Sequence, residues 1–231
     1  MRDMFNQENY LEENPTITVE PNQVEKRLRT LSPDLSTLLF HEVCSSALSA
    51  RAEVTFASAV TEAGSNQWFL TVRYLRTRLA NAGWIIANPS NCPFIVSTDK
   101  AISIIVMTGD SLTGIPDQGS PSNQAQKGKV LAGRVYDNQQ LNLVKRVQHY
   151  SQDTPETVVW VLLYHYDQKT SELRLELSMP NGFNKGKITS CGERIIVPVI
   201  HDNDIIPDLL PFEDQDHSET IVDVTPKTGT I

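Results

Sequence analysis

The hydrophobic positions of this chain change their period near residue 84. Before that point apolar side chains recur with helical spacing, as in the stripe formed by Trp68, Val72 and Leu75. After it, apolar residues form short runs bounded by turn residues, which is typical of strands. The pattern predicts an α+β fold in which an N-terminal helical layer, residues 22–83, packs on a mostly antiparallel sheet, residues 84–200.

Capping signals divide the helical layer. After a short first helix, Ser32-Pro33-Asp34 predicts the start of a second helix, with Ser at the cap and Pro at the first helical position. A third segment is expected over residues 53–63 and ends at Gly64. The last helix of the layer is expected to begin at Ser65 or Asn66.

Five apolar runs predict the sheet. Phe94–Val96 and residues 102–107 flank turn residues and predict a hairpin, whereas the uniformly apolar run 158–164 predicts a central strand covered on both faces. Residues 172–177 alternate strictly, with three leucines on one face and charged side chains on the other, and residues 195–197 close the series. These runs favour a sheet with helices largely on one face.

The segment between the two strand groups, residues 108–128, is rich in Gly, Pro, Ser, Asn, Asp and Gln. Structureless loops of about 20 residues are uncommon in compact domains and are usually functional or disordered, and we favour a functional loop only slightly. Beyond it, residues 139–149 predict a helix with Lys145 and Arg146 exposed.

Charge is segregated along the chain. Residues 1–21 carry −4, residues 22–200 carry +3 and residues 201–231 carry −7, which together give the formal −8. Residues 1–21 lack periodicity and are expected to form a mobile or loosely docked arm. The central segment is expected to be one α+β domain, followed by an acidic, apolar tail.

The same charge balance argues against a protein that simply coats nucleic acid, since that affinity comes mostly from neutralised phosphates. The basic body still allows a local contact face if the helices that carry its side chains are neighbours, although solvated helix surface is the favoured interpretation. Nucleic acid is therefore a partner we do not favour. The weak candidates for such a contact are Arg73, Arg76, Lys127, Lys129, Lys145 and Arg146.

No run of about 18 apolar residues is present, and the N-terminus has neither the basic start nor the apolar stretch of a secretory signal. We therefore expect no membrane partner and a cytoplasmic location. Cys44, Cys92 and Cys191 are far apart and odd in number, which favours reduced structural thiols over disulfides or a metal knuckle.

One set of residues is compatible with catalysis. A nuclease of the restriction-endonuclease type needs two carboxylates to hold Mg²⁺ and a lysine to position the attacking water, and Asp110, Asp167 and Lys169 offer these groups. The last two stand in a predicted turn, where Asp and Lys are ordinary residues, and this structural interpretation is favoured. No catalytic residue, metal ligand or cofactor is predicted otherwise, and Mg²⁺ belongs to this alternative alone.

The C-terminal tail is the stronger candidate. Residues 202–219 contain seven acids, no Lys or Arg, and five large apolar residues interrupted by two prolines. Such a segment can fold onto a basic, grooved partner, with charge steering the encounter and apolar side chains supplying affinity. It can equally pack back on its own body, and either reading makes Phe212 an anchor. The predicted binding residues are Ile205, Ile206, Leu209, Leu210, Phe212, Glu213, Asp214 and Asp216.

The sequence thus favours a cytosolic interaction or regulatory protein that engages a basic protein surface, or occupies a nucleic-acid-binding site by charge mimicry. The alternative is a metal-dependent nuclease whose acidic ends inhibit it. Both hypotheses leave the identity of the partner open.

Overall fold

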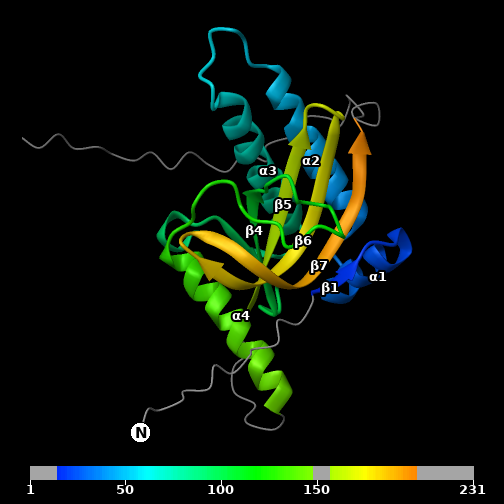
Figure 1. The fold of residues 1–231 in the computed structure, drawn as a ribbon, viewed down its shortest axis with the longest axis vertical. Helices are drawn as coiled ribbons and strands as arrows, with labels where there is room; N and C mark the ends of the chain where they lie inside the picture. The colour runs from blue at the N-terminus through cyan, green and yellow to red at the C-terminus, as the bar shows by residue number, and fades with distance from the viewer. Residues whose placement is uncertain (1–14, 148–156, 202–231) are drawn as a thin grey trace, which may run out of the picture.

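A seven-stranded mixed sheet forms the centre of the computed structural model, which describes residues 15–147 and 157–201. The strand order is β1-β7-β6-β5-β4-β3-β2 (Figure 1). The β1–β7 and β4–β5 pairs are parallel and the other four pairs are antiparallel, which confirms the predicted α+β class with a mostly antiparallel sheet. The strands are β1 (Thr16–Thr18), β2 (Ile85–Ala87), β3 (Phe94–Val96), β4 (Ile102–Thr108), β5 (Val158–Asp167), β6 (Glu172–Asn184) and β7 (Lys187–His201).

Helices cover both faces of this sheet. The first three pack together on one face, and the fourth lies on the opposite face, at the lower left of Figure 1. None of the described helices is long and apolar enough to cross a membrane. The helices are α1 (Pro21–Leu31), α2 (Thr37–Ala52), α3 (Glu62–Asn81) and α4 (Lys129–Val147).

The central strand β5 separates two hydrophobic cores, as its apolar run predicted. Trp160, Leu162 and Tyr164 face the α1–α3 layer, whereas Val159 and Val161 belong to the core beneath α4. All five side chains are at most 2% exposed. Because successive side chains of a strand point to opposite faces, a run without polar residues buries both faces at once.

The second helix begins four residues later than predicted, because Ser32, Pro33 and Asp34 form a turn. Ser32 ends α1 by donating its backbone N–H to Leu28 O at 3.1 Å. The residue that caps α2 is Ser36, whose hydroxyl accepts the backbone N–H of Leu39 at 3.1 Å. The triplet Ser32-Pro33-Asp34 therefore follows the end of α1, and α2 is capped by the second serine, Ser36.

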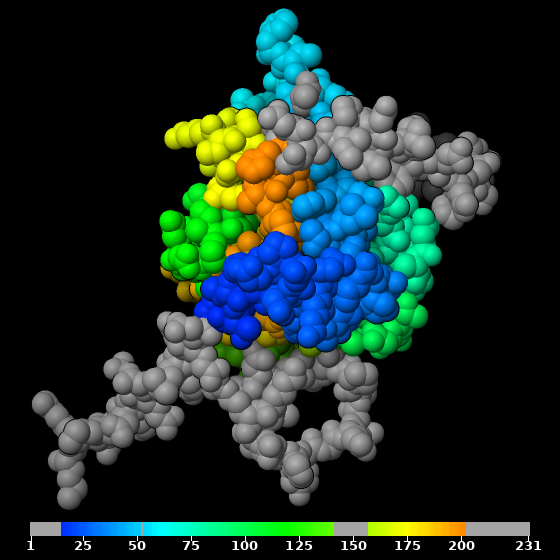
Figure 2. Space-filling view, turned by 90° about the vertical axis from the view of Figure 1, so that its right-hand side faces the viewer, coloured from blue at the N-terminus to red at the C-terminus, as the bar shows by residue number. Residues whose placement is uncertain are grey.

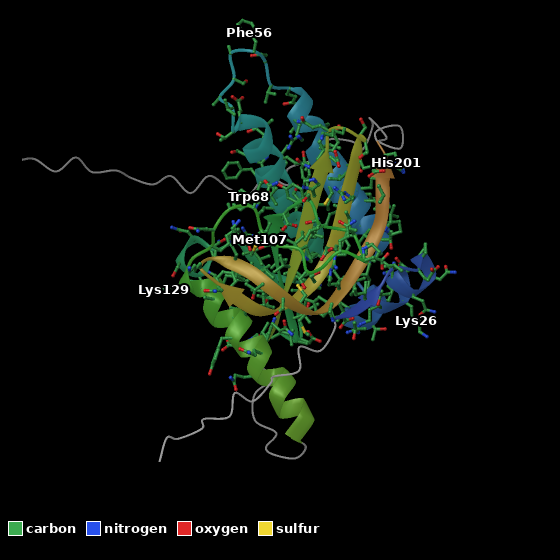
Figure 3. All side chains as sticks on the ribbon, in the orientation of Figure 1. Lys26, Phe56, Trp68, Met107, Lys129 and His201 are labelled. Carbon is green, nitrogen blue, oxygen red and sulfur yellow. The ribbon has the colours of Figure 1, made fainter. Side chains whose placement is uncertain are left out.

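The helical segment predicted over residues 53–63 is wrong. Residues 53–61 form turns, in which the Thr55 backbone N–H donates to the Ser58 hydroxyl at 3.2 Å, and Gly64 lies inside the first turn of α3. Local side-chain to backbone bonds compete with helix in this way. The connection projects beyond the sheet with Phe56 at its tip (Figure 3), and none of the described residues lies there to bury an apolar helical face.

The strands extend beyond their predicted cores. The hairpin of β3 and β4 is confirmed, with Phe94 opposite Ile105. β6 and β7 continue several residues past their apolar runs and pair along most of their length. Part of the predicted N-terminal arm belongs to the sheet: residues 16–18 form β1, a parallel edge strand with Ile17 opposite Arg194. Residues 1–14 lie outside the described part of the chain.

The loop of residues 109–128 completes the face of the sheet that α4 leaves uncovered. It is fastened by a fully buried ion pair, in which the Arg194 Nη2 lies 2.6 Å from a Glu176 carboxylate oxygen. The same carboxylate accepts the Gly114 backbone N–H at 2.8 Å, and Arg194 also donates to Gly119 O and Ile115 O, each at 3.0 Å. The charged face of β6 is therefore interior, and this loop is a structural cover of the sheet.

Candidate functional site

A groove of about 680 Å³ lies where the C-terminal end of α2 and the outer face of α3 meet the edge strand β2. These helices form part of the layer that faces the viewer in Figure 2, with α3 in teal at the right. The groove carries two large exposed apolar side chains, Phe69 at 62% and Ile86 at 50% exposure. Exposed apolar residues that share one depression mark a binding surface more often than isolated ones do.

The helical repeat explains why these side chains face outward. Trp68, Val72 and Leu75 point toward the sheet, and the Trp68 indole N–H donates to Val106 O at 3.1 Å. Positions 69, 73 and 76 each follow one of these residues, which places them about 100° farther round the helix, on the neighbouring face and three and four residues apart. Phe69, Arg73 and Arg76 therefore stand together on the groove wall.

The two arginines differ in their partners. Arg73 is exposed and makes no ion pair within the described residues. Arg76 donates one Nη2 bond to Asn88 Oδ1 at 2.9 Å, whereas its buried Nε finds no acceptor among the described residues. Burial lowers the pKa of Arg76, and its guanidinium remains a cation. A carboxylate entering the groove would supply the missing acceptor.

A second, smaller groove of about 390 Å³ between β1 and α1 offers less to a ligand. Its Arg27 is already paired with Glu193 at 2.5 Å, which uses both the charge and the hydrogen-bonding capacity of that guanidinium. Lys26 also lines this groove (Figure 3). The α3 groove is the better candidate, because neither Arg73 nor Arg76 has an ion-pair partner among the described residues.

The basic residues that the sequence suggested for nucleic-acid contact lie in separate parts of the structure. Arg73 and Arg76 share the α3 groove, while Lys145 and Arg146 lie on α4, on the opposite face of the sheet. The two helices are therefore not neighbours, which was the condition for a joint phosphate-contacting face. The structure describes Lys145 and Arg146 as part of α4, but it does not describe the placement of their side chains.

Lys127 and Lys129 occupy a different place, between the long loop and α4. The ammonium of Lys127 lies 5.5 Å from the centre of the Trp68 ring, and partial burial lowers the pKa of this lysine. Lys129 is the first residue of α4 and lies at its upper end in Figure 3. A cation held over an indole face is a stable packing contact, and these two lysines are not part of the groove.

The three residues of the nuclease alternative stabilise turns. The carboxylate of Asp110 accepts the backbone N–H groups of Leu112 and Ser122, each at 3.1 Å, and so joins the start of the long loop to a point farther along it. Asp167 accepts the Lys169 backbone N–H at 2.9 Å, which lowers the pKa of Asp167. Within residues 15–147 and 157–201, no three His, Cys, Asp or Glu side chains form a group that could hold a metal ion.

The predicted binding residues of the tail lie outside the described residues. The structure shows where the tail begins: β7 ends at His201, which pairs with Glu172 of β6 at the upper end of the sheet (Figure 3). The tail is thus attached directly to a strand that is paired on both sides along part of its length.

Sequence reasoning missed the two apolar residues of the groove. Phe69 follows Trp68, and two adjacent aromatic residues on one helix cannot both face the core, so one outward-facing aromatic was to be expected. Ile86 gave no comparable signal, because whether an edge strand is covered depends on long-range packing. Comparison of the chain with protein-family models, curated proteins and solved structures found no match.

Proposed function

We propose that this chain is an interaction protein of a regulatory kind, which holds a basic, grooved protein partner through its acidic and apolar C-terminal segment, residues 202–219. In this proposal the acids steer the encounter and the apolar residues supply most of the affinity. A partner that binds nucleic acid would be blocked by the same charges, since the segment would occupy its basic site.

The composition of the segment carries the proposal. It combines seven acids with five large apolar residues and contains no Lys or Arg. A segment that served solubility alone would have no use for the apolar residues, because exposed side chains of this kind favour association. Its attachment to the end of β7 supports the proposal, since a paired strand gives the segment a fixed point of departure.

The environment of the candidate carboxylates supports binding over hydrolysis. Both oxygens of Asp110 already accept backbone hydrogen bonds, and Asp167 accepts one from its own turn. The exposed surface supports binding as well, because Phe56 and Val60 of the α2–α3 connection are fully exposed. Large apolar side chains in that position favour contact with another protein.

The experiment compares proteins that co-purify from the native host with the full chain and with a chain ending at Ile200. We expect the full chain to retain a specific partner and the shortened chain to lose it, while far-ultraviolet circular dichroism shows that both remain folded. Release of the partner by competing DNA would identify charge mimicry. Unchanged capture by the shortened chain would refute the proposal.

The same preparations test the nuclease alternative. Mg²⁺-dependent cleavage of nucleic acid by the full chain, lost in both Asp110→Ala and Lys169→Ala variants, would establish hydrolysis as the activity. We expect no cleavage in any of the three proteins.

A further inference from the structure

We infer that the groove of α2, α3 and β2 is the docking site for the chain's own tail, residues 208–214, in the same molecule. This goes beyond the proposed function, because it concerns a surface of this chain. Docking on the groove and binding to a partner use the same tail residues and therefore exclude each other, so the docked tail is the form that the chain adopts without a partner. Three features of the described residues support the tail as the occupant: the place where the tail departs, the apolar side chains of the groove and the charge of its walls.

The tail departs near the end of the groove that is formed by the C-terminal end of α2. His201, Glu172 and Asp167 are paired across β7, β6 and β5, so they lie in one row at the same end of the sheet. Next to Asp167, the ring of Tyr166 lies 5.3 Å from the Arg51 guanidinium of α2. Arg51 is in turn joined to α3 by a 2.9 Å bond to Gln67.

The groove opens beside this contact, since Ala50, which precedes Arg51 on α2, and Glu53, the residue that follows the end of α2, both line it. Crossing from β7 to β5 takes about 10 Å, and passing over one helix layer takes about another 10 Å. An extended chain covers about 3.3 Å per residue, so roughly six residues, ending near position 207, reach the part of the groove formed by Ala50 and Glu53. Four strands separate β7 from β2, so Ile86 lies farther on and is within reach of Phe212 and the acids that follow it.

The groove matches the tail in its chemistry. Its apolar side chains Phe69, Leu70 and Ile86 fit a segment in which Ile, Leu and Phe alternate with prolines. Phe69 is 62% exposed, so covering it removes apolar surface from water and stabilises such a contact. A fully polar occupant would not bury these apolar side chains, and a basic occupant would be repelled by the two arginines of the groove.

The charge on the walls selects an acidic occupant. Arg73 has no ion-pair partner and Arg76 has a buried Nε without an acceptor within the described residues, whereas Glu53 is the single acid among the lining residues. Asp208 stands between the two apolar pairs of the tail, and Glu213 and Asp214 follow Phe212. Carboxylates at these positions can satisfy both guanidinium groups.

The test places the photo-crosslinking residue p-benzoyl-phenylalanine at position 212 of the full chain and maps the crosslinked peptides by mass spectrometry. We expect crosslinks to residues 66–77 of α3 or to β2, in protein that runs at the mass of a single chain. The Arg73→Glu variant should reduce the yield about fivefold at low salt, in line with the loss of one surface charge pair. Arg73→Lys should retain most of it.

Lys26→Glu, which makes the same change of charge on α1, is the matched control and should leave the yield unchanged. Arg73 and Lys26 are both exposed, and neither forms an ion pair within the described residues, so neither variant endangers folding. Crosslinks that map elsewhere, a product of two chains, or equal losses in Arg73→Glu and Lys26→Glu would each overturn the inference. Loss of partner capture is measured separately, so failure here is distinguishable from failure of the proposed function.

Discussion

Replacing Glu176 by Gln should destabilise the protein strongly, because it leaves the charge of Arg194 buried without its counterion. Both side chains are fully buried, and the carboxylate accepts two bonds from Arg194, at 2.6 and 3.1 Å. It also accepts the Gly114 backbone N–H at 2.8 Å. Gln keeps the shape of the side chain and one acceptor oxygen, so the change removes charge with little change in volume.

The magnitude follows from the cost of an unpaired buried charge. Breaking a buried ion pair by changing one partner costs about 3–5 kcal/mol, against a total stability of about 5–15 kcal/mol for a typical domain. Urea unfolding of the full chain, followed by far-ultraviolet circular dichroism, measures the change in the free energy of unfolding. The loop of residues 109–128 should also become sensitive to proteases, since Glu176 and Arg194 fasten it.

Glu193→Gln is the matched control. Its carboxylate pairs with Arg27 at 2.5 Å, but the two side chains keep 14% and 33% of their surface exposed. Because solvent screens this pair, we expect a loss of about 1 kcal/mol or less. If Glu176→Gln costs no more than Glu193→Gln, the buried pair does not fasten the loop as we describe.

The remaining predictions concern other buried or hydrogen-bonded groups. Asn138→Ala should lower the free energy of unfolding in urea by about 2–4 kcal/mol, because the Asn138 side chain donates to two carbonyl groups, on β5 and β6, and accepts one N–H group of β5, at 2.8–2.9 Å. A loss below about 1 kcal/mol would contradict this. Burial raises the pKa of Cys44 and of Cys191 to about 12, so both thiols should resist a disulfide reagent at pH 8 while the partly exposed Cys92 reacts first; labelling of all three at one rate would refute the packing. The Ser97 hydroxyl donates to the Asp99 carboxylate at 2.6 Å and holds the pKa of Asp99 below the ordinary 3.8. The stabilisation that Asp99 gives is therefore fully present above pH 3.8 and is lost as the pH falls through the lower pKa of the folded state. A carboxyl-carbon NMR titration of Asp99 with a midpoint at or above 3.8 would disprove this.

Local patterns predicted the elements whose neighbours lie close in sequence. The β3–β4 hairpin and the buried strand β5 followed from short apolar runs and a four-residue turn, which need no knowledge of the rest of the fold. The start of α2 did not, because Ser32 and Ser36 are both good caps and only packing decides between them. Residue-level signals of this kind fix the type of an element better than its ends.

Long-range pairings account for what the sequence left open. The alternation in β6 predicted a charged face, but not that Arg194 and a loop almost 80 residues away would cover it. The parallel pairing of β1 with β7 likewise joins residues far apart in the chain. In the groove, Arg73 and Arg76 were singled out from the sequence, whereas Ile86 became visible only once β2 lay at the sheet edge.

The central claim is that residues 202–219 act through the combination of acids and apolar residues. It is tested most directly by changing the five apolar residues of the tail to Ser, which preserves its charge, and by measuring the amount of partner that co-purifies from the native host. The account predicts that capture is lost although the net charge is unchanged. Capture at the level of the unmodified chain would contradict it, because acidity alone would then be sufficient.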